Sequence, residues 1–286
     1  MDNDRQPGAF APGPPSLPPG ARLPLNRCNL PALILGSLTY QRHPVALEID
    51  GVRAFHSGLF RRLDALGEPG ARAACFVDYM TVHFCLESLE EAGLTGGVPA
   101  ERRKARANAN YLRLVRGWSF DANGREGAVL KHWVETRFGL LTRFHGGPLH
   151  GRGSEAYQDY LGRAAAGIYG TNAIEAQLDL LYTYCQYEFA RARPGETHVT
   201  LYRGVNRLGE HEVLGGTPEG LEVLLLNNLS SFTDTPERAD EFGDYVLTAT
   251  VPVPKVFFYN RLLPGMLKGE DEWVVIGGVY EVAMRS

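Results

Sequence analysis

The sequence has few cysteines, and their arrangement indicates neither a disulfide framework nor a metal centre. The 4 cysteines in 286 residues form no CxxC pair and show no zinc-ligand spacing with histidine. We expect reduced thiols, mostly in the core, and no metal. No uncharged apolar run approaches the roughly 20 residues of a membrane span, and no apolar stretch near the N-terminus resembles a signal peptide. These absences predict a cytoplasmic protein without a membrane span.

Several common nucleotide-binding and hydrolase motifs are also missing. Neither GxGxxG nor a phosphate-binding P-loop occurs, so a bound dinucleotide would not be held by a doubly wound fold. His145-Gly146-Gly147 has the glycine pattern of an oxyanion-hole loop, but there is no GxSxG nucleophile elbow, which favours a plain glycine-rich turn. Lys and Arg (29) do not outnumber Asp and Glu (33), and the net charge of -4 argues against a nucleic-acid partner.

Composition places the chain among ordinary globular proteins and divides it into three parts. Hydrophobic residues make up 44% and charged residues 22%, which excludes global disorder. Residues 1–22 hold prolines at positions 7, 12, 14, 15, 18 and 19 and are expected to form a disordered tail. Residues 23–192 are expected to be mainly helical, and residues 193–286 to be rich in β-strands. The last two parts are expected to form one compact unit of the α+β class.

The expected helices follow from apolar residues that recur every three or four positions. Leu59, Leu63 and Leu66 show this spacing. Further helices are predicted over residues 71–92, 101–118, 128–142, 154–166 and 171–191. Pro194-Gly195 is expected to end the last of them.

After this break, the sequence changes to short β-branched and aromatic runs separated by turn residues. Strands are predicted over residues 197–202, 245–251, 255–258 and 273–282. Residues 208–229 are expected to contain a loop and a short helix over residues 221–226.

Three short motifs lie in order within the β-rich part. The first is Tyr202-Arg203-Gly204, an arginine at the end of an apolar strand, followed by a glycine that lets a ligand approach the backbone. The second is Ser230-Ser231-Phe232-Thr233, a strand with hydroxyls around an aromatic residue. The third is Glu270-Asp271-Glu272, which leads into the apolar run Trp273-Val274-Val275. If residues 270–272 are extended, both glutamates face one cleft, because residues two apart on a strand point to the same side.

These residue types suit the cleavage of an N-glycosidic bond such as that of NAD. The reaction passes through an oxocarbenium-like state, and a fixed carboxylate beside the ribose stabilises the positive charge as it develops. An arginine can bind a pyrophosphate through two hydrogen bonds.

The order Arg, then Ser-x-Thr, then Glu-x-Glu resembles the arginine–serine–glutamate group of ADP-ribosyltransferases. Within that group, the chain is most similar to the dinitrogenase reductase ADP-ribosyltransferases of nitrogen-fixing bacteria, over nearly its whole length from Leu25 onward. The general group motifs cover only residues 197–283. The resemblance implies a β-rich core of two small sheets, against which the helical region packs.

The resemblance also implies a role for each motif residue. Glu272 would be the catalytic glutamate, oriented by Ser231, and Glu270 would orient and deprotonate the target guanidinium. Arg203 would bind NAD, with Gly204, Phe232 and Thr233 beside it in the NAD site. Phe242 lies where relatives place an aromatic residue against nicotinamide. The motif departs from many relatives in having Ser-Phe-Thr in place of Ser-Thr-Ser, but Thr233 keeps a hydroxyl.

The implied activity is transfer of ADP-ribose from NAD to an arginine of dinitrogenase reductase, which would inactivate that iron protein. The helical region would then dock the target, and a PII-type nitrogen signal protein is an implied second partner. Two other functions stay open: an NAD glycohydrolase that uses the same carboxylates, and a non-catalytic module that binds NAD or a partner. Each motif alone also has a structural explanation as a strand end, a helix cap or an acidic turn. Their conjunction in order favours the enzyme.

Overall fold

The computed structural model describes residues 15–86, 109–168, 173–206, 211–266 and 271–285. Helices dominate up to residue 192, and strands dominate after it, which confirms the α+β class. The helices of the first part are α1 (Ala32–Leu35), α2 (Leu38–Arg42), α3 (Val52–Phe55), α4 (Ser57–Asp64), α5 (Pro69–Phe84), α7 (Tyr111–Phe120), α8 (Arg125–Phe138), α9 (Glu155–Gly167) and α10 (Ala173–Ala192). The second part contains β1 (His198–Val205), β2 (Glu212–Gly216), β3 (Glu222–Thr233), α11 (Pro236–Asp240), β4 (Tyr245–Pro252), β5 (Val256–Tyr259) and β6 (Glu272–Arg285).

The described strands form one antiparallel sheet in the order β2-β3-β1-β4-β6-β5, with an additional pairing between β3 and β6. The expectation of two small sheets is therefore wrong for the part of the chain that the structure describes. The reason is the length of β6, whose 14 residues pair with β3, β4 and β5. Gly277 of β6 lets the strands stay together at an irregularity in β3, since a Cβ there would lie 1.9 Å from the carbonyl oxygen of Asn227.

The short helix expected over residues 221–226 is also wrong, because these residues begin β3. Val223, Leu224, Leu225 and Leu226 are each at most 4% exposed, with β2 paired on one edge and β6 on the other. A strand that is buried on both faces reads as a continuous apolar run without alternation, so periodicity cannot distinguish it from a buried helix.

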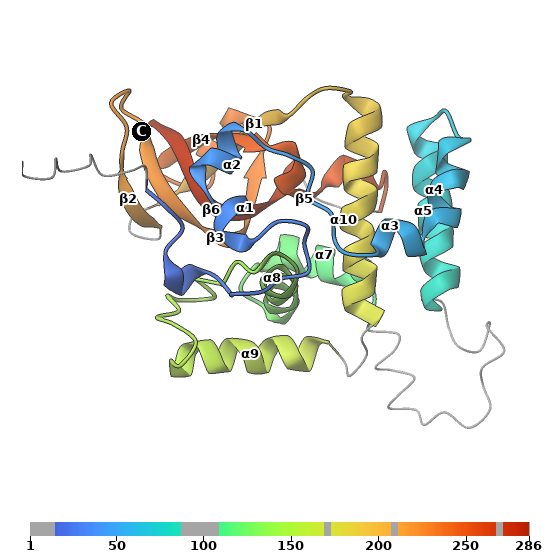
Figure 1. Ribbon diagram of the computed structural model, residues 1–286, viewed down its shortest axis with the longest axis horizontal. Coiled ribbons are helices and arrows are strands. Elements are labelled where there is room, and N and C mark those ends of the chain that lie inside the picture. The colour runs from blue at the N-terminus through green and yellow to red at the C-terminus, as the bar shows by residue number, and fades with distance from the viewer. Residues whose placement is uncertain (1–14, 87–108, 169–172, 207–210, 267–270, 286) are drawn as a thin grey trace, which may run out of the picture.

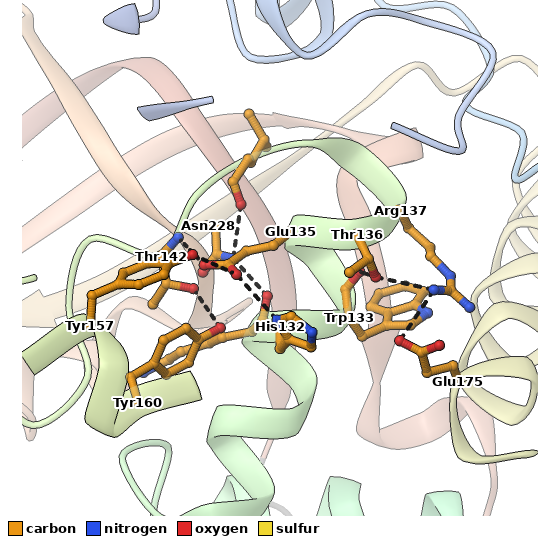
Figure 2. Close-up of polar contacts among 12 residues, drawn as sticks. His132, Trp133, Glu135, Thr136, Arg137, Thr142, Tyr157, Tyr160, Glu175 and Asn228 are labelled. Atoms are coloured by element: carbon orange, nitrogen blue, oxygen red, sulfur yellow. Dashed lines mark hydrogen bonds and ion pairs between the residues drawn. The ribbon is translucent and has the colours of Figure 1, made fainter. Parts of the chain in front are cut away.

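Helix α8 lies against the sheet and supports the strand that carries the second motif (Figure 1). The side-chain amide of Asn228 in β3 donates hydrogen bonds to the carbonyl oxygens of Lys131 (2.8 Å) and Leu140 (3.1 Å). Figure 2 shows Glu135 of α8 beside Thr142 and Tyr157. The Glu135 carboxylate accepts the backbone N–H of Thr142 (2.8 Å) and the hydroxyl of Tyr157 (3.0 Å), so it joins α8 to α9.

Helix α10 runs along the edge of the sheet beside β5, and α3, α4 and α5 lie on its far side (Figure 1). The buried Arg137 of α8 forms an ion pair with Asp179 of α10 at 2.7 Å. Arg137 also contacts Glu175 of the same helix (Figure 2), at 3.3 Å. Arg72 of α5 pairs with the buried Glu188 of α10, also at 2.7 Å. One hydrophobic cluster continues from these helices into the strands, so helices and sheet share a core.

Residues 15–22 differ from the disordered tail expected over residues 1–22. They include a short 3-10 helix (Pro19–Ala21), and the side chains of Leu17 and Ala21 are each 2% exposed. The carbonyl of Ala21 accepts the backbone N–H of Leu141 at 2.9 Å, and the N–H of Leu23 donates to Gly139 at 2.8 Å. The apolar Leu17 and these backbone bonds hold the segment against the core despite its prolines. Residues 1–14 lie outside the described residues.

Among the helices that the structure describes, none is both long enough and apolar enough to cross a bilayer.

Candidate active site

The three sequence motifs meet where β3 lies between β1 and β6. Thr233 of β3 pairs with Tyr202 of β1 on one side and with Glu272 of β6 on the other. Arg203 follows Tyr202, and Ser231 lies two residues before Thr233, so all three motifs lie at the same end of the sheet. The tertiary structure thus brings together Arg203 and Glu272, which are 69 positions apart in the sequence.

A chain of hydrogen bonds joins the arginine, the serine and the glutamate. The Arg203 guanidinium donates through Nη1 to the carbonyl oxygen of Ser231 at 2.7 Å. The hydroxyl of the same serine donates to Oε1 of Glu272, also at 2.7 Å. The expected contact between Ser231 and the glutamate is therefore present. Arg203 orders the backbone of the serine whose side chain holds the carboxylate.

These residues line one cavity of about 830 Å³, a size typical of small-molecule sites. The cavity is lined by every predicted NAD-binding residue and by Glu272; these are Arg203, Gly204, Ser231, Phe232, Thr233, Phe242 and Glu272. A larger cavity, of about 1180 Å³, lies between α10 and residues 26–54, and none of the predicted site residues line it. The smaller cavity is therefore the candidate active site.

Glu270 lies outside the described residues. The expectation that it faces the same cleft as Glu272 depended on an extended backbone over residues 270–272, and Asp271 is not extended. Strand β6 begins at Glu272, and Asp271 has a φ of 53° in the left-handed region. The alternation of side chains along a strand therefore does not extend back through Asp271. The Asp271 carboxylate instead accepts a hydrogen bond from Arg261 at 2.9 Å, which ties the start of β6 to the segment after β5.

Gly204 was expected to let a ligand approach the backbone, but in the structure it lets another part of the protein approach. A Cβ at this position would lie 2.1 Å from the carbonyl oxygen of Ala239 and 3.0 Å from the carbonyl carbon of Phe242. The close approach is therefore between β1 and the C-terminal end of α11, within the protein. Gly204 shapes the cavity by letting α11 and Phe242 pack closely against the arginine strand.

Phe242 and Thr233 lie on the α11 side of the cavity. The Phe242 ring is 61% exposed, and the Arg238 guanidinium carbon lies 5.1 Å from the ring centroid, within the range of a cation–π contact. The hydroxyl of Thr233 accepts the backbone N–H of Thr235 at 3.2 Å. Thr235 precedes α11 but makes no side-chain capping bond, so the Thr233 hydroxyl is what stabilises the turn into this helix.

Two residues that no motif indicated complete the polar chain. The indole N–H of Trp118, in the last turn of α7, donates to the Ser231 hydroxyl at 2.9 Å. The hydroxyl of Ser119 donates to Oε2 of Glu272. Both residues line the cavity. Trp118 is the last residue of the helix predicted over residues 101–118, and Ser119 lies just beyond that range although α7 includes it. The contact between Ser119 and Glu272 spans 153 positions. No local pattern could have found them.

Two basic groups near Arg203 have lowered pKa values. Lys131 is 2% exposed, and its Nζ lies 5.7 Å from the Trp118 ring centroid. Burial, with a smaller effect from the Arg203 charge, lowers the pKa of Lys131 to about 7. Burial and the same arginine lower the pKa of His211 to about 4. Burial is the main cause of both shifts, and the Arg203 charge adds to it because a second positive charge nearby is disfavoured.

No group of three His, Cys, Asp or Glu side chains that could hold a metal ion is found in the ranges that the structure covers.

Comparison with known proteins places the chain in one family. Residues 25–284 match the family model described as dinitrogenase reductase ADP-ribosyltransferase (DRAT). The chain is 40% identical over 266 residues to the NAD(+)–dinitrogen-reductase ADP-D-ribosyltransferase of Rhodospirillum rubrum, which covers 92% of this chain and 95% of the relative. No solved structure shows a significant match. The chain belongs to the dinitrogenase reductase ADP-ribosyltransferase family.

Proposed function

We propose that this protein transfers ADP-ribose from NAD to an arginine of dinitrogenase reductase, and that the modification inactivates the target and so regulates nitrogen fixation. The name and extent of the 40% identical relative support the substrates. The observation that carries the chemistry is the hydrogen-bonded chain from Arg203 through Ser231 to Glu272, along the wall of one cavity of about 830 Å³.

In the proposed reaction, the bond between C1′ of the nicotinamide ribose and the nicotinamide nitrogen breaks, and nicotinamide leaves with the electron pair. The Glu272 carboxylate stabilises the positive charge that develops on the ribose. A nitrogen of the target guanidinium then forms the new bond to C1′ and loses a proton. Glu270 is proposed to orient this guanidinium and accept that proton.

The remaining site residues are proposed to bind NAD. Arg203 is proposed to bind the pyrophosphate, because a guanidinium forms strong charge-assisted bonds to phosphate oxygens. Phe242 offers an exposed ring face for nicotinamide. Gly204, Phe232 and Thr233 line the same wall. NAD is the substrate in this scheme, and no metal takes part in it.

The test is incubation of the purified protein with dinitrogenase reductase and NAD labelled in its adenylate half. Label on an arginine of the target, located by mass spectrometry, supports the proposal. Consumption of NAD to free ADP-ribose alone would identify a glycohydrolase. No consumption would identify a non-catalytic binding module. Target docking on the helical region and binding of a PII-type protein stay predictions, which co-purification with each candidate would test.

A further inference from the structure

We propose that Trp118 and Ser119 of α7 are positioning residues for the Glu272 carboxylate. The inference deepens the proposed function, because it takes Glu272 as the catalytic group. In this proposal, α7 keeps the Glu272 side chain in a single orientation although the two are far apart in the sequence. The carboxylate contacts two hydroxyls, one from β3 and one from α7.

Trp118 determines the direction of the Ser231 hydrogen bond. An indole N–H can only donate, so the Ser231 oxygen must accept from it at 2.9 Å. A serine hydroxyl carries one proton, and that proton is then directed at Oε1 of Glu272, 2.7 Å away. Without the indole N–H, the Ser231 hydroxyl could rotate and donate its proton to another acceptor. Trp118 therefore orients Ser231 as a donor to the carboxylate.

Ser119 holds the other carboxylate oxygen. Its hydroxyl contacts Oε2 of Glu272 and also lies 3.3 Å from the carbonyl oxygen of Val115 in the preceding turn of α7. One proton can serve only one of these acceptors, and an ionised carboxylate is the stronger acceptor. With both oxygens bonded to hydroxyls from different elements, rotation of the carboxylate would break at least one hydrogen bond.

The helix that presents these two residues is well anchored. Trp118 is 2% exposed, and Lys131 of α8 lies against its ring. Lys131 is itself held by the side-chain oxygen of Asn123 at 3.2 Å and by the carbonyl of Phe144 at 3.1 Å. Arg116, one turn before Ser119, donates two hydrogen bonds to the carbonyl of Met266, at 3.2 and 2.9 Å. Helix α7 is thus fixed both to α8 and to the segment after β5.

A positioning role predicts a loss of turnover rather than of NAD binding. A small displacement of a catalytic group can cost on the order of 100-fold in rate. We expect Trp118→Phe and Ser119→Ala each to lower kcat for NAD cleavage and for transfer to dinitrogenase reductase by about 10- to 100-fold, with KM for NAD changed less than about threefold. Ser119→Thr, which keeps the hydroxyl, is expected to retain most of the activity.

Matched variants separate positioning from stability. Trp133→Phe also removes a buried indole hydrogen bond, to Asp179 at 2.6 Å, but away from the cavity. Ser154→Ala removes a hydroxyl that caps α9. Both controls are expected to lower thermal stability while keeping kcat.

The inference would be overturned if Trp118→Phe and Ser119→Ala kept the wild-type kcat, if they raised only KM, or if Trp133→Phe lost as much turnover. An inactive wild-type protein would instead refute the proposed function itself.

Discussion

At the scale of single residues, the proposed chemistry depends on the position of Glu272 at the beginning of β6. The residues that follow it, Trp273 to Ile276, are at most 5% exposed, whereas Glu272 is half-buried at the cavity wall. The buried strand residues thus fix the backbone next to Glu272, while its carboxylate stays in contact with the cavity. Its function is then decided by its charge and by the hydroxyls of Ser231 and Ser119.

Replacing Glu272 and Glu270 one at a time should separate NAD cleavage from transfer to arginine. Glu272→Gln keeps the shape but removes the charge, so we expect a loss of at least about 100-fold in both NAD cleavage and transfer. Glu270→Gln is expected to keep much of the cleavage but to lose arginine transfer. Rates of nicotinamide release and of target labelling measure the two activities. Glu281→Gln, on the same strand but paired with Arg42, is the control and should behave as wild type. Wild-type transfer in Glu272→Gln would refute the assignment.

At the scale of elements, the cavity depends on how closely α11 packs on β1. The contact between them is direct at Gly204, where the backbone of α11 leaves no room for a side chain. This packing positions Phe242 and Arg238 in the wall of the cavity, to which Trp118 and Ser119 of α7 also contribute.

Adding one methyl group at Gly204 should push α11 and Phe242 away from β1. Gly204→Ala places a Cβ against the backbone oxygen of Ala239, which cannot rotate away, so we expect the free energy of unfolding to fall by about 1–3 kcal/mol. Urea unfolding measures this free energy. KM for NAD should also rise, because Phe242 lines the cavity. Gly162→Ala is the control: this glycine lies within α9 with no atom within 4 Å of an added Cβ, and alanine should add about 0.5–1 kcal/mol. Equal stability of Gly204→Ala and wild type would contradict this account.

At the scale of the whole molecule, the core that joins helices and sheet contains buried amines. Lys255 is fully buried, donates to the carbonyl of Gly277 at 2.7 Å, and lies 4.8 Å from the Tyr280 ring centroid. Burial lowers the pKa of Lys255 to about 7. In the unfolded chain this amine regains its ordinary pKa near 10.4. Folding therefore releases a proton between these two values.

The stability of the protein should consequently rise with pH just above neutrality. Between about pH 7 and pH 10 the unfolded state binds the Lys255 proton and the folded state does not, so the free energy of unfolding increases with pH. One such group contributes at most about 1.4 kcal/mol per pH unit. In Lys255→Met this contribution disappears, and the slope measured by urea unfolding between pH 7.5 and 8.5 should be smaller by up to that amount. Identical slopes for variant and wild type would show that Lys255 is not neutral in the folded protein.

Local patterns in the sequence were sufficient for most elements and for the set of motif residues. The expected helix over residues 154–166 is α9, and the strand expected over residues 245–251 is β4, because apolar spacing reflects which face of an element is buried. Pro194-Gly195 follows the end of α10 as predicted. Arg203, Ser231 and Glu272 were selected by their order and by the family resemblance, and the structure places them at one cavity; their catalytic roles stay predictions.

The local pattern failed where burial or distant contacts override it. Leu224 to Leu226 are buried on both faces, so their run lost the alternation that indicates a strand. Leu17 lies in a proline-rich segment, but packing against the core orders it.

The sequence by itself determined which residues could perform the reaction, since the charge of a carboxylate and the donors of a guanidinium belong to the residue type. Only the tertiary structure decided which of them act together. It joined β1, β3 and β6 at Thr233 and placed α11 against Gly204. It also brought Trp118 to Ser231 and Ser119 to Glu272, in each case across more than a hundred positions. Hydrogen bonds depend on distance in space. The residues on either side of Trp118 and Ser119 in the sequence therefore do not indicate which distant residues these two contact.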